Sequence, residues 1–254
     1  MKYSIAYKTI VNKEIRRFTR IWPQTVLPPA ITTSLYFLIF GTLIGARIGL
    51  MNGRPYMEYI VPGIILMSVI SNSYSNVVSS FYSTKFQRQI EELLIAPVPN
   101  WVILAGYVTG GVARGLIVGT VVAVISNLFT EMHVQHYGIA VGVVLLTSTL
   151  FSLAGFINAT FANSFDDISI IPNFVLTPLI YLGGVFYSIN LLPEIWQHIS
   201  LANPILYMVN AFRYGILGIT DIDIATAFLV IVAFNLVLVA ASLICLHKGV
   251  GIKN

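Results

Sequence analysis

Two adjacent carboxylates, Asp166 and Asp167, are the first residues of this chain whose types suggest acid–base chemistry. A hydrolytic site also needs a second titratable group and a positioned water, and nothing else polar converges near them in the sequence. Capping of a following helix at its positive dipole end is the better interpretation. His133 and His136, with Glu131 nearby, have a spacing that a metal could use, but solvated loop histidines are the commoner case. We therefore predict no catalytic residue and no metal site.

A short charged segment, residues 84–98, is the strongest candidate for recognition of a partner. Read as a helix, it spaces Phe86, Ile90, Leu93 and Leu94 at i, i+4, i+7 and i+8, with charges between them. Pro97 then ends the helix. Two interpretations stay open at this point, a helix that docks on a cytoplasmic partner and an amphipathic connector resting on lipid. The candidate contact residues are Arg88, Glu91, Glu92, Leu94, Ala96 and Pro97.

The composition places this segment in a membrane protein. The chain is 57% hydrophobic and 9% charged, whereas a soluble domain carries about 25% charged residues. A net charge of +4 that is spread along the chain indicates loop bias and gives no sign of nucleic-acid binding. One cysteine, Cys245, excludes an intramolecular disulfide. The first apolar run is too long for a cleavable signal peptide, so we expect none.

The apolar runs predict an all-α polytopic protein with six membrane-spanning helices, folded as one permease domain over residues 1–254. The fifth run is interrupted by Pro172 and Pro178. A semi-polar stretch, 188–218, follows it and predicts short external or re-entrant helices. The six predicted spans are Val26 to Gly45, Tyr59 to Phe81, Trp101 to Phe129, Tyr137 to Phe161, Ile170 to Tyr187 and Ile222 to Leu246.

Positive charge predicts the orientation. With the N-terminus inside, ten of the 14 basic residues fall in cytoplasmic segments, three fall outside and Arg114 lies within the third span. Both termini are then cytoplasmic. Residues 1–22 predict an interfacial helix, with Lys13, Arg16, Arg17 and Arg20 on one face and mainly apolar side chains on the other. Binding to the anionic inner leaflet and simple topology signalling are both compatible with that pattern.

A polar stripe on the second span and a glycine-rich third span are the remaining candidate sites. Hydroxyls and amides within hydrocarbon need partners, so the stripe either lines a hydrated substrate path or holds helices together. Glycines at four-residue spacing favour close helix packing. The stripe comprises Ser68, Asn72, Ser75, Asn76 and Ser79, and the third span carries Gly106, Gly110, Gly111, Gly115 and Gly119.

Arg114 lies among these glycines, where an arginine costs roughly 2.5–3.5 kcal/mol on insertion scales. An intramembrane ion pair with Asp166 or Asp167 and snorkelling toward the inner surface both stay open. No phosphate-binding G-x-x-x-x-G-K-[ST] loop occurs, so we expect no ATP hydrolysis by this chain. A self-sufficient secondary transporter and a channel are the alternatives. No acid lies near the centre of a predicted span, which argues against proton coupling.

The phrase Glu91-Glu92-Leu-Leu-Ile-Ala-Pro-Val-Pro, with six spans and an amphipathic N-terminus, resembles the membrane subunits of type-2 ABC exporters. The likeness covers essentially the whole chain, and relatives include nodulation-factor and drug-export permeases. Two stretches, Phe165 to Ser169 and Leu176 to Tyr187, resemble one type of bacterial inner-membrane permease in particular.

The resemblance implies a function and partners. The Glu91-Glu92 helix would be the coupling helix, which fits a groove on a separate ATP-binding cassette subunit. Two permease copies and two ATPase copies would form the working unit in the bacterial inner membrane, surrounded by membrane lipids. ATP and Mg would bind the partner subunit, and this chain would bind no cofactor. The substrates of the family are typically amphipathic lipids, glycolipids or drugs.

Overall fold

The computed structural model describes residues 2–251, apart from the side chains of Lys2 and Leu94. Met1 and residues 252–254, including the Lys253 of the charge count, lie outside the described part. The structure is helical except for one short hairpin, as the composition predicts. The elements are α1 (Lys2–Arg20), α2 (Trp22–Tyr36), η1 (Phe37–Ile44), α3 (Gly45–Ile48), β1 (Leu50–Met51), β2 (Arg54–Pro55), α4 (Tyr56–Phe86), α5 (Gln89–Ile95), α6 (Asn100–Phe129), α7 (Tyr137–Phe161), α8 (Asp167–Ile171), η2 (Pro172–Leu176), α9 (Thr177–Leu182), η3 (Ile189–Leu191), α10 (Glu194–Leu201), α11 (Pro204–Leu217) and α12 (Ile224–Lys248).

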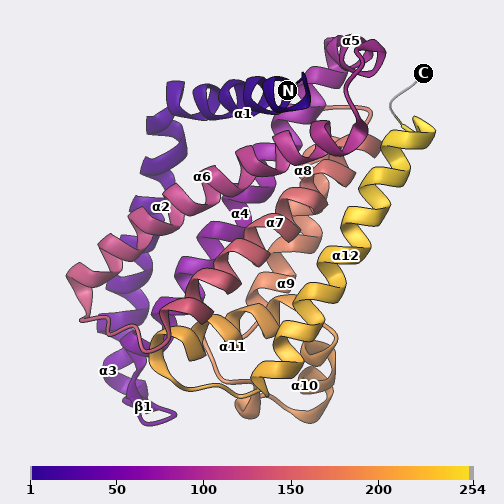
Figure 1. Ribbon diagram of the computed structural model, residues 1–254. Coiled ribbons are helices and arrows are strands. Elements are labelled where there is room, and N and C mark those ends of the chain that lie inside the picture. The colour runs from indigo at the N-terminus through magenta and orange to yellow at the C-terminus, as the bar shows by residue number, and fades with distance from the viewer. Residues whose placement is uncertain (1, 252–254) are drawn as a thin grey trace.

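The long helices run between two ends of the molecule that differ in their elements (Figure 1). One end carries α1, α5 and the C-terminal turn of α12, and we refer to it as the α5 end. The other end carries the β1–β2 hairpin, α10 and α11, and we refer to it as the α10 end. Helix α1 lies across the long helices at the α5 end, as an interfacial helix does.

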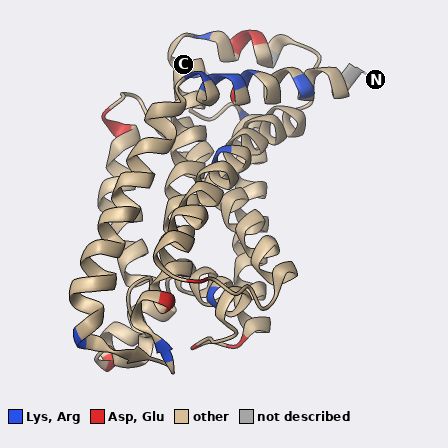
Figure 2. Cartoon of the chain, turned by 90° about the vertical axis from the view of Figure 1, so that its left-hand side faces the viewer, with Lys and Arg blue, Asp and Glu red and all other residues tan. Residues whose placement is uncertain are grey.

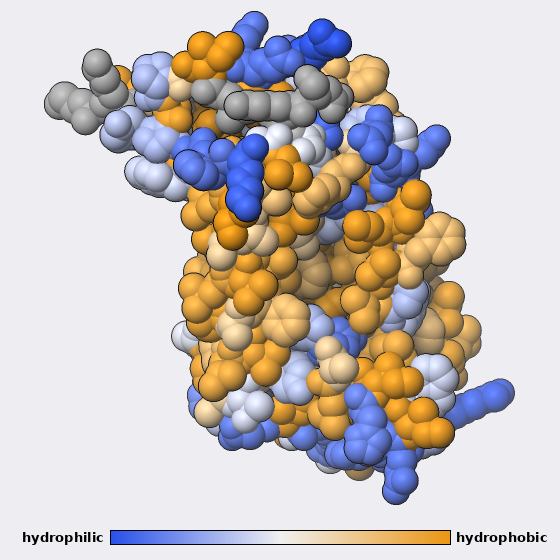
Figure 3. Space-filling view, turned by 90° about the vertical axis from the view of Figure 1, so that its right-hand side faces the viewer, coloured by the Kyte–Doolittle hydropathy of each residue, from blue (hydrophilic) through white to orange (hydrophobic). Residues whose placement is uncertain are grey.

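Charge and hydropathy separate along the long axis of the molecule. Lysine and arginine gather on α1 and beside α5, while most of the helical length between the two ends carries neither sign of charge (Figure 2). The face seen in Figure 3 has a broad hydrophobic band, with hydrophilic residues toward both ends. Such a band between polar ends is the surface that a bilayer requires.

Within residues 2–251, five helices are long and apolar enough to span a membrane, compared with six predicted. Helix α7 has the predicted bounds, and α6 and α12 agree with theirs to within two residues. The first span continues from α2 through the π-helical η1 to α3, over Trp22–Ile48. The predicted fifth span is the exception, because the apolar helix there covers only Asp167–Leu182.

The short fifth segment has a local cause. Pro172 and Pro178 each remove a backbone N–H donor, and the chain passes through the π-helical η2 between α8 and α9. Gly184, with a φ of 71°, then turns the chain away from the helical path. The chain continues into α10 and α11, which form in the stretch predicted to hold short helices.

Helix α4 is the centre of the bundle. In the most apolar 18-residue stretch of α4, 78% of the residues are buried, whereas the corresponding fraction in the other four spans is 17% to 56%. It packs against α6 and α7 along its length and against α11 nearer the α10 end. Helices α2 and α12 lie at the periphery, where most of their side chains face outward. The polar stripe predicted on the second span therefore lies inside the protein.

The glycines of α6 are contact points for three neighbouring helices. A Cβ atom at Gly106 would lie 2.5 Å from Ile10, and one at Gly110 would lie 2.5 Å from the Glu14 side chain, both on α1. On other sides of α6, Gly111 faces Ser152 of α7 and Val77 of α4. Farther along, Gly115 and Gly119 face Ser73 and Val69 of α4. Small residues allow these close approaches, so α6 holds α1, α4 and α7 together.

The contact at Gly106 gives a first prediction. Gly106→Leu forces a side chain into the space of Ile10, and overpacking of this kind costs about 1–3 kcal/mol. We expect a lower apparent unfolding temperature in detergent. Gly142→Leu on α7 is the matched control, since a Cβ there meets nothing within 4 Å. Equal unfolding temperatures for the two variants would show that α1 does not pack against α6 as described.

Candidate coupling surface and membrane pathway

Helix α5 forms in the charged segment and presents its acidic residues outward. Arg88 precedes it in a left-handed backbone conformation, with a φ of 59°, which turns the chain sharply after α4. Ile90 is buried and anchors the helix, whereas Glu91 and Glu92 are exposed. Ile95 at the end of the helix is 85% exposed, an unusual position for a large aliphatic side chain. The surface therefore combines two carboxylates with an apolar tip.

The candidate coupling residues divide by exposure. Arg88, Glu91, Glu92 and Pro97 are exposed, and Ala96 is half-buried. The side chain of Leu94 lies outside the described part of the structure. Ile95 was not among the predicted contact residues, because the helical pattern emphasised the apolar face around Ile90. The sequence shows that this isoleucine lies between charged residues and Pro97. Only the structure shows that its side chain is exposed and could therefore contact a partner.

The lysine at the end of α4, just before α5, joins α4 to α7. Lys85 Nζ donates to the carbonyl oxygens of Thr160 and Ala162, at 2.8 and 2.7 Å. These carbonyls belong to the C-terminal end of α7, where helical carbonyls lack intrahelical partners and the helix dipole favours a cation. The lysine therefore joins the ends of α4 and α7 directly beneath α5.

Aromatic side chains reinforce this junction. The ring of Phe165, in the loop after α7, packs edge-on against Tyr82 at 4.9 Å and Phe86 at 5.2 Å between centroids. A polar cavity of about 370 Å³ lies between α5 and this loop, and Lys85, Arg88 and Glu91 contribute to its lining. The α5 surface thus rests on α4 and on the α7–α8 loop together.

The basic helix α1 lies at the same end of the molecule but is only partly free (Figure 2). Arg16 and Arg20 are exposed, as the predicted basic face requires. Arg17 instead turns inward, where its Nη2 atom donates to the carbonyl oxygen and to the amide Oδ1 of Asn76, at 2.8 and 2.7 Å. The division into a basic face and an apolar face was therefore wrong for Arg17.

Glu14 is the buried acid that sequence reasoning missed. Its side chain is 0% exposed, and Arg17 Nε lies 3.4 Å from its Oε2 atom. Ser80 Oγ donates to its Oε1 atom at 2.6 Å, and Lys13 Nζ lies 3.8 Å from that atom. Gly110 leaves the space that the Glu14 side chain occupies. The only sign in the sequence that Glu14 is buried was its position among basic residues, four residues after the apolar Ile10.

The polar stripe of α4 contacts two arginines. Asn76 binds Arg17 of α1, and one helical turn away Asn72 Oδ1 accepts a hydrogen bond from Arg114 Nε at 3.3 Å. Ser79 is a further acceptor for Arg17 at 3.3 Å. The stripe thus connects α1 with α6 through α4, which is the role of interhelical glue.

One part of the stripe also borders open space. A cavity of about 190 Å³ lies between α2 and α4, and Ser68, Ser71 and Asn72 form its polar side. Pro28, Pro29 and Tyr36 form part of the opposite side. Ser75 is half-buried and lies outside this lining. Of the five predicted pathway residues, the structure brings Ser68 and Asn72 to a cavity, whereas Asn76 and Ser79 bind Arg17.

Of the two possibilities left open for Arg114, the ion pair with Asp166 or Asp167 does not form among the described residues. Asp167 instead accepts hydrogen bonds from the backbone N–H groups of Asn163 and Ser164, at 2.8 and 3.1 Å. Ser164 Oγ accepts in return from the backbone N–H of Asp167, a reciprocal capping box at the start of α8. Asp166 is exposed and its side chain makes no capping bond. The N–H group that opens α8 is therefore capped by Ser164, while the Asp167 carboxylate holds the turn that precedes the helix.

A second polar cluster lies at the α10 end and was also missed. Arg213 of α11 is fully buried, donates to the carbonyl oxygen of Gly184 at 2.6 Å, and lies 4.0 Å above the Tyr59 ring. Asp221 accepts from Ser188 Oγ at 2.8 Å and from Tyr59 at 3.5 Å. These bonds join α4, α11 and the turn after α9. Arg213 belongs to the semi-polar stretch 188–218, where short helices were predicted, and nothing in the sequence indicated that it is buried within the fold.

The histidines of the α6–α7 connection do not form a metal site in the described residues. His133 is exposed and lies 3.8 Å from Glu131. His136 stacks on the Tyr214 ring at 5.0 Å. Among the residues that the structure describes, no group of three His, Cys, Asp or Glu side chains gathers closely enough to hold an ion.

The buried acid gives a second prediction. Glu14→Ala removes the carboxylate that balances Arg17 and accepts from Ser80. We expect a loss of about 2 kcal/mol in unfolding free energy, less than for a fully buried pair because Arg17 keeps both Asn76 oxygens. The apparent unfolding temperature in detergent measures this loss, and Lys8→Ala, at an exposed position of the same helix, is the control. A similar shift in both variants would contradict the buried pair.

Comparisons with known proteins agree with this architecture. The sequence profile of the ABC-2 type transporter family matches residues 5–217. The chain is 57% identical over 255 residues to the inner membrane transport permease YadH of Escherichia coli K12, which covers 99% of this chain and 98% of that protein. It is 25% identical over 186 residues to nodulation protein J of Sinorhizobium fredii, which covers 73% of this chain and 70% of that protein.

The resemblance carried by the α5 phrase and by the two stretches after α7 is confirmed by these matches. The family match covers most of the chain, and the YadH match covers nearly all of both proteins. The matched family is a transporter family, and the YadH protein is named a transport permease. The chain belongs to the ABC-2 type transporter family.

Proposed function

We propose that this chain is the membrane permease of an ATP-driven exporter in the bacterial inner membrane. The observation that carries the proposal is α5, a short acidic helix with an exposed apolar tip that directly follows α4, whose end Lys85 joins to the end of α7. Family membership implies association with an ATP-binding subunit. The name of the similar YadH protein supports the inner-membrane location.

In this proposal the α5 end faces the cytoplasm. The basic residues on α1 and the lysines near the ends of α4 and α12 lie at that end, as positive charge at a cytoplasmic surface does. Both termini are then cytoplasmic. Glu91, Glu92 and Ile95 enter a groove of the ATP-binding subunit, while the exposed Arg16 and Arg20 flank it or contact anionic lipid.

The working unit is two copies of this chain with two copies of the ATPase. ATP and Mg bind the ATPase, and association of the two ATPase copies moves both α5 helices. Since Lys85 fixes the end of α4 to the end of α7, that motion is delivered to the two helices at once. An outward path then opens between bundles, and hydrolysis resets it.

The substrate class is amphipathic, such as a lipid, a glycolipid or a drug-like molecule. The cavity between α2 and α4 supports this class, because both of its walls mix polar and apolar residues: Thr32 lies beside Pro28 and Pro29 on α2, and Ser68 and Asn72 lie beside Met67 on α4. Such a mixed lining suits a molecule with polar and apolar parts. Arg114, bound to Asn72, places a positive charge next to the polar side.

A secondary transporter has less support in the structure. Ion coupling usually employs an acid near the middle of the membrane. Glu14 is buried, but it lies on α1 at the α5 end and is paired with Arg17 and Ser80. A structural role is sufficient for this acid, and α5 would have no purpose in an ion-coupled transporter.

The proposal predicts that the α5 acids are needed for the ATPase. We expect Glu91→Ala/Glu92→Ala to weaken association with the ATP-binding subunit about tenfold or more, equivalent to at least about 1.4 kcal/mol. Co-purification and permease-dependent ATP turnover in lipid nanodiscs measure the effect. The matched control is Glu131→Ala/Glu194→Ala, which removes two exposed acids elsewhere on the chain.

Two results would reject the proposal. One is wild-type protein that associates with no ATP-binding cassette subunit while an ion gradient drives its transport. The other is an α5 variant and a control variant with the same turnover. Ile95→Ala provides a further check, since loss of the apolar tip should weaken association without changing any charge.

A further inference from the structure

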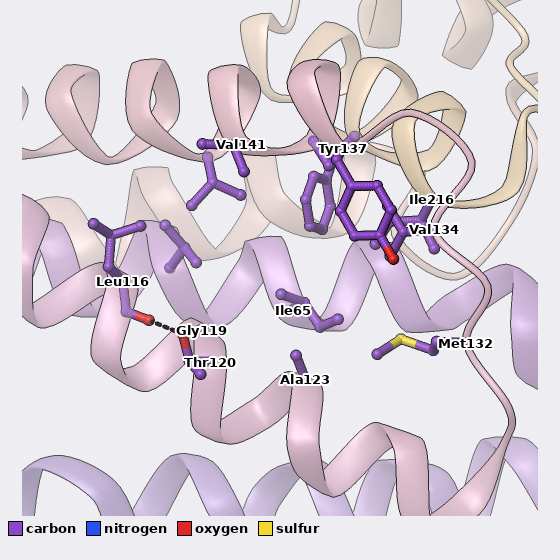
Figure 4. A pocket seen from close by; sticks show the side chains of 14 residues that line it. Ile65, Leu116, Gly119, Thr120, Ala123, Met132, Val134, Tyr137, Val141 and Ile216 are labelled. Carbon is purple, nitrogen blue, oxygen red and sulfur yellow. Dashed lines mark hydrogen bonds between the residues drawn. The ribbon is translucent and has the colours of Figure 1, made fainter.

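A third cavity, larger than those beside α5 and between α2 and α4, lies away from both the α5 surface and the polar stripe. It has a volume of about 430 Å³ and is enclosed by α4, α6, α7, α11 and the α6–α7 connection (Figure 4). Ile65, Ala123 and Val141 contribute its sides, and Met132 and Val134 of the connection lie at one end. Because this connection lies near α11, the cavity is in the half of the molecule toward the α10 end.

The cavity is apolar in its chemistry. None of its lining residues is charged. The hydroxyl of Thr120 donates to the Leu116 carbonyl oxygen at 2.8 Å, so it needs no ligand and leaves its methyl group as the free part of the side chain. The hydroxyl of Tyr137 is the other side-chain oxygen of the lining. The space therefore offers contact with methylene groups and no site for a charged head group.

The cavity opens onto the side of the bundle. Thr120, Tyr137 and Val141 line it and are themselves exposed, so the space reaches the molecular surface between α6 and α7. The neighbouring positions Val124 and Leu145 on these two helices are also exposed. In a chain that spans the membrane such apolar faces contact hydrocarbon, and the opening therefore leads into the bilayer.

We propose that this cavity binds one aliphatic chain of a membrane lipid, taken from the leaflet at the α10 end. An unfilled space would forfeit dispersion contacts along its walls, and apolar cavities do not hold water well. A volume of about 430 Å³ is within the 300–1,000 Å³ of typical ligand sites. The Tyr137 hydroxyl, on a side chain that is 71% exposed, is placed to meet the lipid's polar interface.

The size of the cavity favours a lipid chain over a second copy of the protein. A helix is about 10–12 Å wide with a pitch of 5.4 Å, so one turn alone fills roughly 400–600 Å³. A helix of another copy would therefore have to enter end-on, whereas a methylene chain enters from the adjacent bilayer. The site requires only the membrane and does not depend on the proposed coupling to an ATPase.

Photo-crosslinking in nanodiscs tests the site. The permease alone is reconstituted with phosphatidylethanolamine that carries a diazirine on one acyl chain, irradiated, and mapped by peptide mass spectrometry. We expect labels on the cavity-lining parts of α6, α7 and the connection. Ala123→Phe fills the cavity and should reduce those labels roughly tenfold. That reduction corresponds to a loss of about 1.4 kcal/mol in the binding free energy of the lipid chain.

Two further variants keep the result interpretable. Val124→Phe adds the same ring at the next residue, which is 60% exposed and not part of the lining, and its labelling should match the wild type. Thr120→Phe blocks the exposed mouth and should act like Ala123→Phe even if the latter does not fold. Unchanged cavity labels in both blocking variants, or wild-type labels confined to other faces, would overturn the proposal.

A second copy over the opening would also overturn it. Val141→Cys, in a Cys245→Ser background, places a thiol at the mouth. Efficient disulfide formation between copies in membranes would show that protein covers the cavity. Monomeric Val141→Cys, together with the labelling pattern above, is the expected result.

Discussion

Hydrocarbon supplies no hydrogen bonds, and this constraint acts most strongly on α4, the most buried of the long helices and the one that carries the polar stripe. Its amides and hydroxyls must find partners within the protein. Some are satisfied by α4 itself, and several others by side chains of neighbouring helices, among them Arg17 of α1 and Arg114 of α6. The placement of the neighbouring helices around α4 follows from those bonds and from the glycines that allow close approach.

The two arginines that bind α4 make different use of this arrangement. Arg17 has a carboxylate, Glu14, and two oxygens of Asn76, so its charge is compensated near the α5 end. Arg114 has one amide oxygen as its hydrogen-bond partner in the described residues. Asn72 thus belongs both to the structural network and to the lining of the cavity between α2 and α4.

Sequence patterns predicted the features that each depend on a single element. Helix α7 was obtained with its bounds, and α5 was located by its charge pattern and its terminating Pro97. The predictions that failed concerned partners on different elements. Hydropathy cannot show that Glu14 faces Gly110 or that Arg213 lies over Tyr59. It also cannot show that Asp167 is hydrogen-bonded to Ser164 and not to Arg114. The fifth segment failed for another reason, because composition measures apolarity but not the effect of two prolines on helix length.

The self-satisfied side chains of α4 also bear on biosynthesis. Ser68, Asn72, Ser79 and Thr84 each donate to a carbonyl oxygen four residues earlier in the same helix. These bonds require no other part of the protein, so they exist as soon as the helix has formed. We therefore expect the nascent helix to leave the translocation channel with these four side-chain donors already bonded, before α6 has been synthesised. The bonds from Arg17 and Arg114 form later and stabilise the assembled bundle. Insertion of the helix into the lipid does not require them.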